Sequence, residues 1–401
     1  MSHYISVTDA IGMIRDHLRP ISESQPLAVT DALGKVLAEP VQSPGAWPPY
    51  ARAAMDGYAF RALDTPGALK VVGTLFAGAV WPRSLSPGEA LRIMTGAPIP
   101  LGADTVLELE RVGDGPVITI SERVKPGRNI MQAGHEYSPD DVVVPRYVRL
   151  TPLHLGQLAA LGYRTVPVLR SPRVLLLITG DEVQAAGTAL KPGHIYDANG
   201  PMFTAFLRSL GCSVTMRHIP DQPQRLKEVL RQASAKHYDL VISTGGVSVG
   251  GRDYLPDLLA DHFERLFWHV DMHPGKATAA ALLAPNLPLI ALSGNPGAAL
   301  TAWYLIVAPT VLNLLHQSTD LSEVRGRLAS PYPKPTRETR YLKARFRQGT
   351  TGLWFDLVDN QSSDALSSFA AADGLVVIPH GSPPQPQGAE FTAIRLRRPG
   401  D

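Results

Sequence analysis

The 401-residue sequence has only one cysteine, Cys212. A single thiol excludes an internal disulfide and every zinc or iron–sulfur site that needs several thiolates. A chain without disulfides fits a reducing compartment, so we expect a cytoplasmic protein. Cys212 follows Gly211 and precedes an apolar run, which favours a place in the core over a role as a nucleophile.

An excess of charge of one sign is also missing, because 38 Lys and Arg residues are matched by 36 Asp and Glu residues. The formal net charge of +2 gives no reason to expect nucleic acid as a partner. The N-terminus lacks the charged and then apolar pattern of a secretory signal. The most apolar later stretch, residues 302–315, contains Pro309 and is shorter than the roughly 18 residues of a membrane span, so we expect no such span.

Several motifs of enzyme classes are absent as well. The sequence offers no Ser/His/Asp triad, no Gly-x-Ser-x-Gly elbow and no Walker loop. His262, His269 and His273 lie close in sequence, but their spacing does not match a metal site on a helix. A structural or solvent-facing role is favoured for them over zinc binding.

Proline, in contrast, is abundant, and its 36 residues mark the modules of the chain. Ser6 and Asp9 resemble a capping box at the start of a helix over residues 7–18, and residues 30–39 read as a second helix before Pro40. Strand-like runs then alternate with Pro/Gly turns, which indicates a β-rich insertion. Further helices are expected at residues 153–161, 201–210, 223–237, 256–263 and 297–315, and strands at 69–72, 90–94, 214–219, 267–272, 341–346, 353–358 and 374–378.

The pattern predicts a multidomain protein of the α/β plus β class with four modules. These are an elongated N-terminal linking domain (1–45 and 139–170), a β-rich insertion domain (46–138), an α/β domain (171–320) and a strand-rich C-terminal domain (321–401).

Three loops of glycine and small polar residues each follow a short apolar run in the α/β module. Runs of this length suit strands buried on both faces, as in a parallel sheet. Since helical patterns lie between them, all three loops should lie at one edge of the sheet, where open α/β sheets bind ligands. Exposed backbone N–H groups there favour an anion, so we expect a site for a phosphate-bearing or oxyanionic small molecule. The loops are Thr179-Gly180-Asp181-Glu182, Thr244-Gly245-Gly246-Val247-Ser248-Val249-Gly250 and Ser293-Gly294-Asn295-Pro296-Gly297.

Acidic residues accompany these loops. Asp181 and Glu182 are in the first loop, Asp221 follows a predicted strand, and Asp253 comes shortly after Gly250. Carboxylates beside an anion site repel one another unless a hard cation bridges them, and Mg²⁺ commonly binds one or two carboxylates plus a substrate phosphate. The alternative is that Asp221 and Asp253 only cap helices.

Pro274-Gly275-Lys276 adds a turn with a cation after another predicted strand. Lysine is a usual partner of phosphate or another oxyanion. A solvated turn lysine is the equally weighted alternative.

Six motifs in chain order carry a resemblance to a known family. They are Ala54-Met55-Asp56-Gly57-Tyr58-Ala59, Met94-Thr95-Gly96-Ala97-Pro98-Ile99-Pro100, Thr179-Gly180-Asp181-Glu182, Ser243-Thr244-Gly245-Gly246-Val247-Ser248-Val249-Gly250, Pro274-Gly275-Lys276 and Gly294-Asn295-Pro296. Over essentially its whole length the chain resembles the MoeA and gephyrin E-domain family, the molybdopterin molybdenumtransferases.

The resemblance implies an elongated four-domain homodimer with a three-layer molybdopterin-binding α/β domain and a small C-terminal β-barrel. The implied enzyme is a transferase of molybdenum cofactor biosynthesis. It inserts molybdenum from molybdate into adenylylated molybdopterin and releases AMP in a Mg²⁺-dependent step at the dimer cleft. Molybdopterin adenylyltransferase and molybdoenzyme maturation proteins are the implied partners.

The resemblance also assigns roles to residues. Asp56, Thr95, Glu182, Asp221 and Asp253 are the implied catalytic residues, and Glu182, Asp221 and Asp253 the implied metal ligands. Asp56 and Thr95 would face the α/β domain of the other subunit. The substrate-binding set is Thr179, Gly180, Asp181, Gly245, Gly246, Ser248, Gly250, Pro274, Gly275, Lys276, Ser293, Gly294, Asn295 and Pro296, and His273, Lys276, Lys343 and Ser363 would contact molybdate.

The chain departs from the family pattern mainly in the implied molybdate pocket. His273 stands where a lysine is frequent, Ala298 replaces a serine, and Lys343 replaces an arginine that makes a bidentate contact. Met131 stands where an arginine is usual, and His135-Glu136 replaces Glu-Asp. Two readings follow: an active molybdenum transferase, or a paralogue that binds the pterin nucleotide and inserts metal poorly. A scaffold role has little support, although a groove on the C-terminal domain that binds a peptide remains open.

Overall fold

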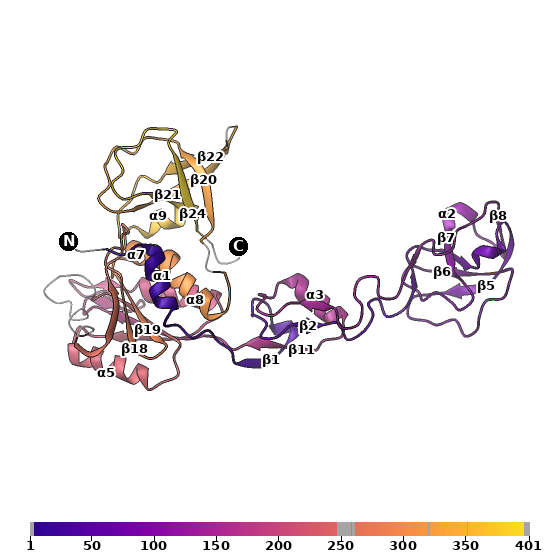
Figure 1. Cartoon of the computed structure of the whole chain (residues 1–401), viewed down its shortest axis with the longest axis horizontal. Coiled ribbons are helices and arrows are strands. Elements are labelled where there is room, and N and C mark those ends of the chain that lie inside the picture. Colours follow the sequence, from indigo (N-terminus) through magenta and orange to yellow (C-terminus); the bar gives the residue numbers. More distant parts are fainter. Residues whose placement is uncertain (1–3, 247–257, 259–260, 319–320, 351, 397–401) are drawn as a thin grey trace. The chain divides into compact units, whose positions relative to one another are not determined.

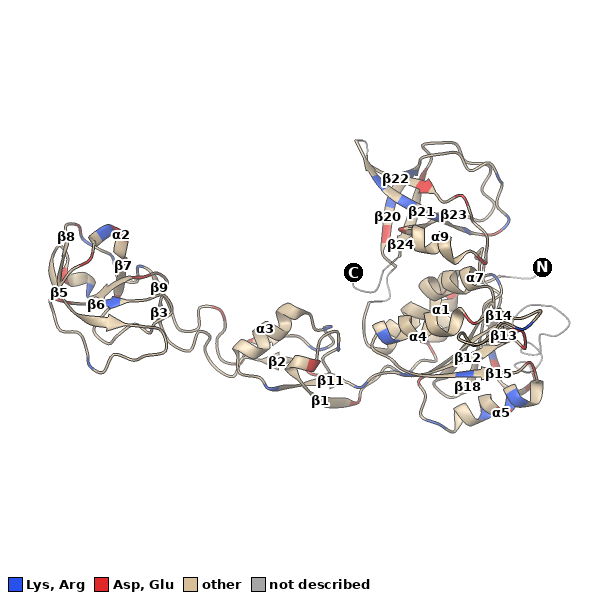
Figure 2. Cartoon of the chain, turned by 180° about the vertical axis from the view of Figure 1, so that it is seen from behind, with Lys and Arg blue, Asp and Glu red and all other residues tan. Residues whose placement is uncertain are grey.

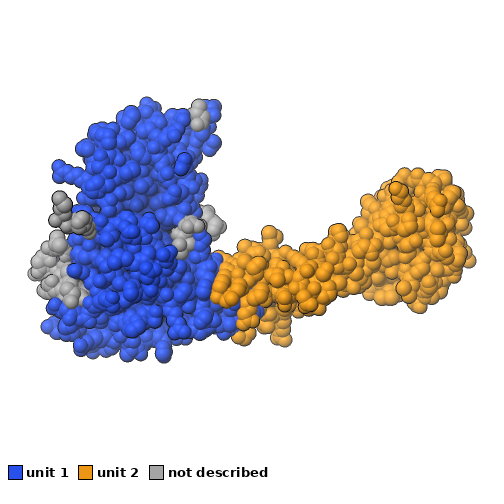
Figure 3. Space-filling view, in the orientation of Figure 1, with its two compact units in different colours: residues 1–25, 34–38, 167–401 blue, residues 26–33, 39–166 orange. Residues whose placement is uncertain are grey.

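The computed structural model describes the chain except for residues 1–3, 247–257, 259–260, 319–320, 351 and 397–401. Two compact units are distinguished (Figure 3). Residues 1–25, 34–38 and 167–401 form the large unit, and residues 26–33 and 39–166 form the small unit. The predicted fold class is confirmed, while the four domain boundaries stay a prediction.

The small unit is built around a five-stranded sheet in the order β7-β4-β6-β5-β8. Successive side chains of a strand point to opposite faces, so Tyr58 and Phe60 of β4 enter one buried cluster and Ala59 enters the other. Both faces are therefore covered, as a β-rich insertion domain requires. Its elements are β2 (Val41–Gln42), β3 (Arg52–Ala53), β4 (Gly57–Phe60), β5 (Gly67–Leu75), β6 (Glu89–Ile93), β7 (Thr105–Glu108), α2 (Leu109–Val112), β8 (Val117–Ile120), β9 (Ile130–Met131), β10 (Val142–Val144) and α3 (Pro152–Ala160).

The helix expected over residues 30–39 is wrong. The chain forms a short 3-10 turn at Val29–Asp31, and Gly34 then takes φ +72°, which ends any helix. Leu37 instead forms an isolated β-bridge with Val168. This stretch thus lies beside the strand pair β1 (Ser24–Ala28) and β11 (Thr165–Leu169), and tertiary pairing overrides its helical pattern.

The large unit contains a six-stranded sheet in the order β15-β12-β16-β19-β18-β17. The four strands from β15 to β19 are parallel, as predicted, and β18 and β17 add antiparallel pairs at one edge. In Figure 1, α5 covers one face of the sheet, and α1, α7 and α8 lie on the other. The bounds are α1 (Val7–Arg15), β12 (Arg173–Thr179), β13 (Val183–Gln184), β14 (Ile195–Tyr196), α4 (Asn199–Ser209), β15 (Ser213–Ile219), α5 (Pro223–Ser234), β16 (Leu240–Thr244), β17 (Glu264–Trp268), β18 (Ala279–Ala284) and β19 (Leu287–Leu292).

The predicted start of the first helix agrees with the structure, whereas the predicted end of one strand does not. The Ser6 side chain accepts a hydrogen bond from the Asp9 N–H at the start of α1, as expected. The strand expected at residues 267–272 stops at Trp268, because His269 adopts φ +73°. The helix expected at residues 256–263 lies mostly outside the described residues.

One apolar helical segment runs through Pro296–Leu314, in agreement with the helix expected at residues 297–315. It consists of α7 (Pro296–Ala302), a π-helical turn at Trp303–Val307 and α8 (Ala308–Leu314). The wider turn precedes Pro309, which then occupies a first-turn position of α8 where a missing N–H is tolerated. By length and composition this segment could cross a membrane, but 78% of its tested window is buried inside the protein.

The C-terminal part of the large unit is a closed barrel in the order β20-β22-β21-β23-β24. Leu342, Phe355 and Val376 belong to its buried core. The three strands expected in this part of the chain are confirmed. The elements are β20 (Glu323–Leu328), β21 (Arg340–Gly349), β22 (Gly352–Leu357), α9 (Leu366–Ala371), β23 (Gly374–Ile378) and β24 (Glu390–Arg395).

Candidate functional site

The three glycine loops meet at the carboxyl ends of β12, β16 and β19, as predicted from the sequence. The Thr179 hydroxyl donates to the Thr244 carbonyl at 3.0 Å, and the Gly245 N–H donates to the Leu292 carbonyl at 3.0 Å. A Cβ added to Gly245 would lie 2.6 Å from Thr179 Oγ1, and one added to Gly294 would lie 3.5 Å from Gly245 Cα. A side chain at Gly245 would therefore push the first two loops apart, whereas the backbones at Gly294 and Gly245 lie within ordinary contact distance of each other.

Asp181 and Asp221 form a reciprocal pair at this edge of the sheet. The Asp181 N–H donates to Asp221 Oδ2 at 3.3 Å, and the Asp221 N–H donates to Asp181 Oδ1 at 3.1 Å. The parallel register places Thr179 of β12 opposite Ile219 of β15, so the residues that follow these two strands lie side by side. Backbone donors thus hold two carboxylates close together.

The remaining acids are only partly described. Glu182 folds back over the first loop, since a Cβ on Gly180 would lie 2.9 Å from each Glu182 carboxylate oxygen. Asp253, Ser248 and Gly250 lie outside the described residues. Among the residues that the structure does describe, no group of three or more His, Cys, Asp or Glu side chains is arranged to hold a metal. The Asp181–Asp221 pair offers the hard oxygen donors that Mg²⁺ prefers, which fits an ion that a substrate phosphate completes.

Asn199 is a residue of this site that the sequence did not identify. It starts α4 and is 7% exposed, and its Nδ2 donates to the Gly294 carbonyl at 2.9 Å. Its Oδ1 is buried and has no hydrogen-bond partner among the described residues. The contact joins residues 95 positions apart, so no local sequence signal identifies it.

A second cluster surrounds the start of α7. The Ala298 N–H donates to the Ser363 carbonyl at 2.9 Å, and Asn295 Nδ2 lies 3.5 Å from Ser363 Oγ. A Cβ on Gly275 would lie 3.1 Å from the Ala298 carbonyl oxygen. The predicted residues Gly275, Asn295 and Ser363 are thus brought together at one helix start.

The predicted cations near this cluster have different surroundings. Lys343 is fully buried, its ammonium donates to the Ser362 carbonyl at 2.9 Å, and burial lowers its pKa. Lys276 lies 3.5 Å from Glu338 and over the Tyr4 ring, and the Tyr4 hydroxyl first, then Glu338, raise its pKa. Burial and then the nearby Arg340 charge lower the pKa of His273, which favours the neutral ring.

Asp56 and Thr95 are brought together on the small unit. Asp56 Oδ1 accepts from both the Thr95 N–H and the Thr95 hydroxyl, each at 2.7 Å. The Thr95 hydroxyl, followed by its backbone N–H, lowers the pKa of Asp56. Both residues are exposed, and the loop is fixed because a Cβ on Gly57 would lie 2.1 Å from the Leu107 carbonyl oxygen. The pair is an exposed, ionised carboxylate held in one orientation.

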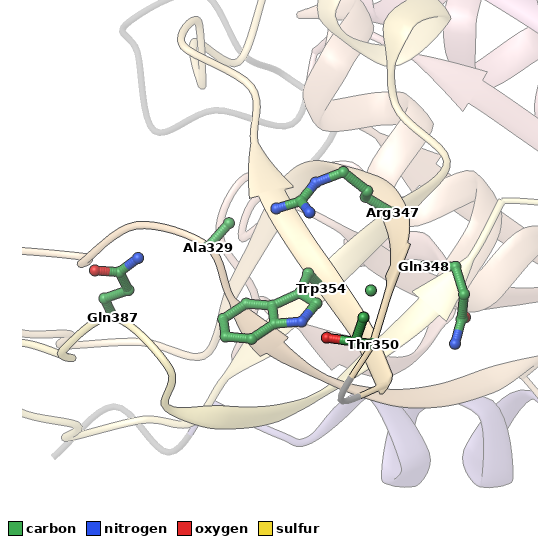
Figure 4. A pocket seen from close by; sticks show the side chains of 7 residues that line it. Ala329, Arg347, Gln348, Thr350, Trp354 and Gln387 are labelled. Carbon is green, nitrogen blue, oxygen red and sulfur yellow. The ribbon is translucent and has the colours of Figure 1, made fainter.

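A separate cavity of about 670 Å³ lies on the barrel and includes none of the predicted site residues. Figure 4 shows Trp354 of β22 within it, between Arg347 and Thr350. Gln348 and Gln387 add polar groups, so this is not the apolar groove left open by the sequence.

Comparisons with known proteins agree across the chain. The family description "MoeA N-terminal region (domain I and II)" matches residues 5–162, "Probable molybdopterin binding domain" matches 175–313, and "MoeA C-terminal region (domain IV)" matches 325–396. Molybdopterin molybdenumtransferase of Staphylococcus epidermidis is 32% identical over 389 residues, 94% of this chain and 92% of the relative. The protein of that name from Bacillus subtilis is 31% identical over 396 residues, 95% and 92% of the two chains.

The fold is shared with solved structures. A molybdopterin biosynthesis MoeA protein from Pyrococcus horikoshii OT3 has a TM-score of 0.83 and 26% identity, covering 98% of this chain and 100% of that one. The chain therefore belongs to the MoeA family of molybdopterin molybdenumtransferases, transferases of molybdenum cofactor biosynthesis. The family resemblance drawn from six sequence motifs is confirmed.

Proposed function

We propose that this protein inserts molybdenum from molybdate into adenylylated molybdopterin and releases AMP. The observation that carries the proposal is the contact of Thr179, Gly245 and Gly294, which joins three loops at the carboxyl edge of the parallel sheet. Loops of this kind bind anionic ligands through backbone N–H groups. The relatives that the chain matches are named molybdopterin molybdenumtransferase, which supports the transfer of molybdenum to molybdopterin.

In the proposed reaction the glycine loops bind the pterin and its phosphates. The Asn199 amide holds the Gly294 carbonyl and so fixes the third loop against the start of α4. Fixed dipoles of this kind stabilise developing charge without further reorganisation. The cluster at the start of α7, with Asn295 and Ser363, would take the molybdate oxyanion, and Lys343 and Lys276 would supply positive charge nearby.

Asp181 and Asp221 would hold Mg²⁺ together with the substrate phosphate, and Glu182 and Asp253 are the further proposed ligands. When bound, the ion would neutralise charge on the phosphate that leaves as AMP. The carboxylates themselves orient the attacking oxygen and keep the pyrophosphate region from rotating.

Asp56 and Thr95 would complete the site in a homodimer, each subunit contributing them to its partner. Two properties support this role: the carboxylate is ionised and exposed, and Thr95 fixes its orientation. An exposed acid fixed by two donors suits the positioning of a substrate group. A cytoplasmic location and contact with a molybdopterin adenylyltransferase and molybdoenzyme maturation proteins belong to the same proposal.

The test is a single-turnover assay with purified protein, adenylylated molybdopterin, Mg²⁺ and molybdate. The proposal requires AMP release that depends on both molybdate and Mg²⁺, together with formation of molybdenum-loaded cofactor. Absence of AMP release at saturating substrate would overturn it.

A second candidate is a carrier that binds the pterin nucleotide without efficient metal insertion. It is favoured by the surroundings of Lys343, whose ammonium is buried and bonded to a carbonyl of its own domain. This candidate predicts tight nucleotide binding by calorimetry with no turnover, and efficient turnover would eliminate it.

A further inference from the structure

A second cavity lies at the opposite edge of the sheet, beside the amino ends of its strands. Its volume is about 470 Å³, within the usual range for small-molecule sites. Arg173 starts β12, Asp239 precedes β16, and Leu287 starts β19. Since β12 spans seven residues, the cavity lies about 20 Å from the glycine loops, by a rise of roughly 3.3 Å per residue.

Three of the residues that line this cavity, Arg170, Asp239 and Glu23, are joined by ion pairs. Arg170 forms two bonds with Asp239, from Nη1 at 2.7 Å and from Nη2 at 2.9 Å, and Nη2 also lies 3.4 Å from Glu23. The Arg173 N–H donates to Asp239 Oδ2 at 2.7 Å. Asp239 is therefore fully engaged and holds the strand starts in place.

Three further cations line the cavity without an ion-pair partner among the described residues. Arg19, Arg173 and Lys236 line the cavity, are exposed, and form no ion pair within the described part of the chain. His237 and Tyr238 also line the cavity. The lining therefore has an excess of positive charge, since Arg19, Arg170, Arg173 and Lys236 outnumber the two acids Glu23 and Asp239.

We infer that this cavity binds a phosphate-bearing small molecule, at a place separate from the proposed transfer site. Positive charges that line a concave surface raise the local concentration of anions. Three unpaired cations with an aromatic ring beside them suit a phosphate group more than a neutral ligand, and the cavity is large enough for a nucleoside monophosphate. Figure 2 marks lysine and arginine positions in blue on α5, the helix that precedes Lys236 in the chain.

The experiment is isothermal titration of AMP and, separately, inorganic pyrophosphate into the full-length protein and two double variants. Arg173→Gln with Lys236→Gln removes two wall charges, and Arg208→Gln with Arg265→Gln removes two exposed charges elsewhere on the large unit. We expect about tenfold weaker binding of at least one probe in the first variant and little change in the second. Because AMP is also the proposed product at the glycine loops, only binding that the Arg173/Lys236 variant weakens is assigned to this cavity. Weaker binding of AMP alone assigns a nucleoside phosphate, and weaker binding of pyrophosphate assigns an inorganic one.

Equal affinity in wild type and the Arg173/Lys236 variant, or no binding of either probe, would overturn the inference. Arg19→Gln, which lies in the connection after α1, is a milder variant that keeps the strand starts unchanged. Molybdate-dependent AMP release should stay intact in the Arg173/Lys236 variant, so loss of this site and failure of the proposed transfer reaction are separate results.

Discussion

The glycine-loop edge and the cluster at the start of α7 are both proposed to bind anions, but they are built differently. The first uses backbone N–H groups and glycines whose missing side chains allow loop contact. The second depends on ionisable side chains, of which Lys343 is buried and His273 is shifted towards the neutral form. The backbone N–H groups of the first keep their character at any pH, whereas the ionisable side chains of the second change with protonation and with each substitution.

The sharpest test of the backbone site is Gly245→Ala. The new Cβ would meet Thr179 Oγ1 at 2.6 Å and the Thr179 carbonyl oxygen at 2.9 Å, at a residue with φ +89°. We expect molybdate-dependent AMP release to fall by about 100-fold or more, because a displaced loop places the bound substrate wrongly for the reaction.

Gly187→Ala is the matched control for this change. Its φ is +96°, but a Cβ there would meet no atom within 4 Å. The Gly187→Ala variant therefore introduces backbone strain without a clash between loops, and we expect it to keep almost full AMP-release activity. Equal losses in both variants would show that the close packing of the loops is unimportant.

Asp221→Asn tests the acidic part of the same edge. The amide oxygen can still accept from the Asp181 N–H, but the charge that would hold Mg²⁺ is lost. We expect a loss of about 100-fold in turnover and a weaker dependence on Mg²⁺ concentration, measured by AMP release. The exposed Asp359→Asn is the control, and an unchanged Mg²⁺ dependence in Asp221→Asn would remove this residue from the ion site.

The side-chain site is tested by restoring the residues frequent in the family. Ala298→Ser adds a hydroxyl to a residue whose N–H contacts the Ser363 carbonyl, and His273→Lys adds a permanent charge two residues before Gly275. We expect molybdate affinity to increase by roughly threefold to tenfold, from one or two charge-assisted hydrogen bonds. Unchanged affinity in a molybdate titration would show that these positions do not contact the oxyanion.

The smallest expected effect concerns Asp56. Its pKa in the folded protein is lowered, so the hydrogen bonds from Thr95 add stability above the unfolded-state pKa, and this stability is lost as the pH falls through the folded-state pKa. Thr95→Val should therefore raise the Asp56 pKa towards its ordinary value, which an NMR titration of the carboxyl carbon would measure. An identical titration curve in Thr95→Val would show that Thr95 does not hold this carboxylate.

Much of the fold follows from local sequence patterns. The buried runs before Thr179, Thr244 and Ser293 identify the parallel strands, and the glycines after them identify the loops. The helix expected over residues 30–39 failed because Gly34 turns the chain and Leu37 pairs with Val168, which a single segment does not reveal. The π-helical turn before Pro309 was missed for the same reason: it depends on packing within the large unit.

The sequence predicted the candidate site less completely than it predicted the fold. Thr179, Gly245 and Asp221 were found because each lies at or just after the carboxyl end of a strand, and such positions converge in a parallel sheet. Asn199 was missed because its partner, Gly294, is distant in sequence. The burial of Lys343 was also missed, because the sequence pattern of a strand does not distinguish a buried lysine from an exposed one.

The central claim is that the nucleotide end of the substrate lies on the backbone of the three glycine loops. A crystal structure with bound adenylylated molybdopterin tests it most directly. The account predicts phosphate oxygens within hydrogen-bonding distance of N–H groups in these loops, next to the Asp181 and Asp221 carboxylates. Phosphate density in another part of the protein, or loops occupied by the protein's own side chains, would contradict it.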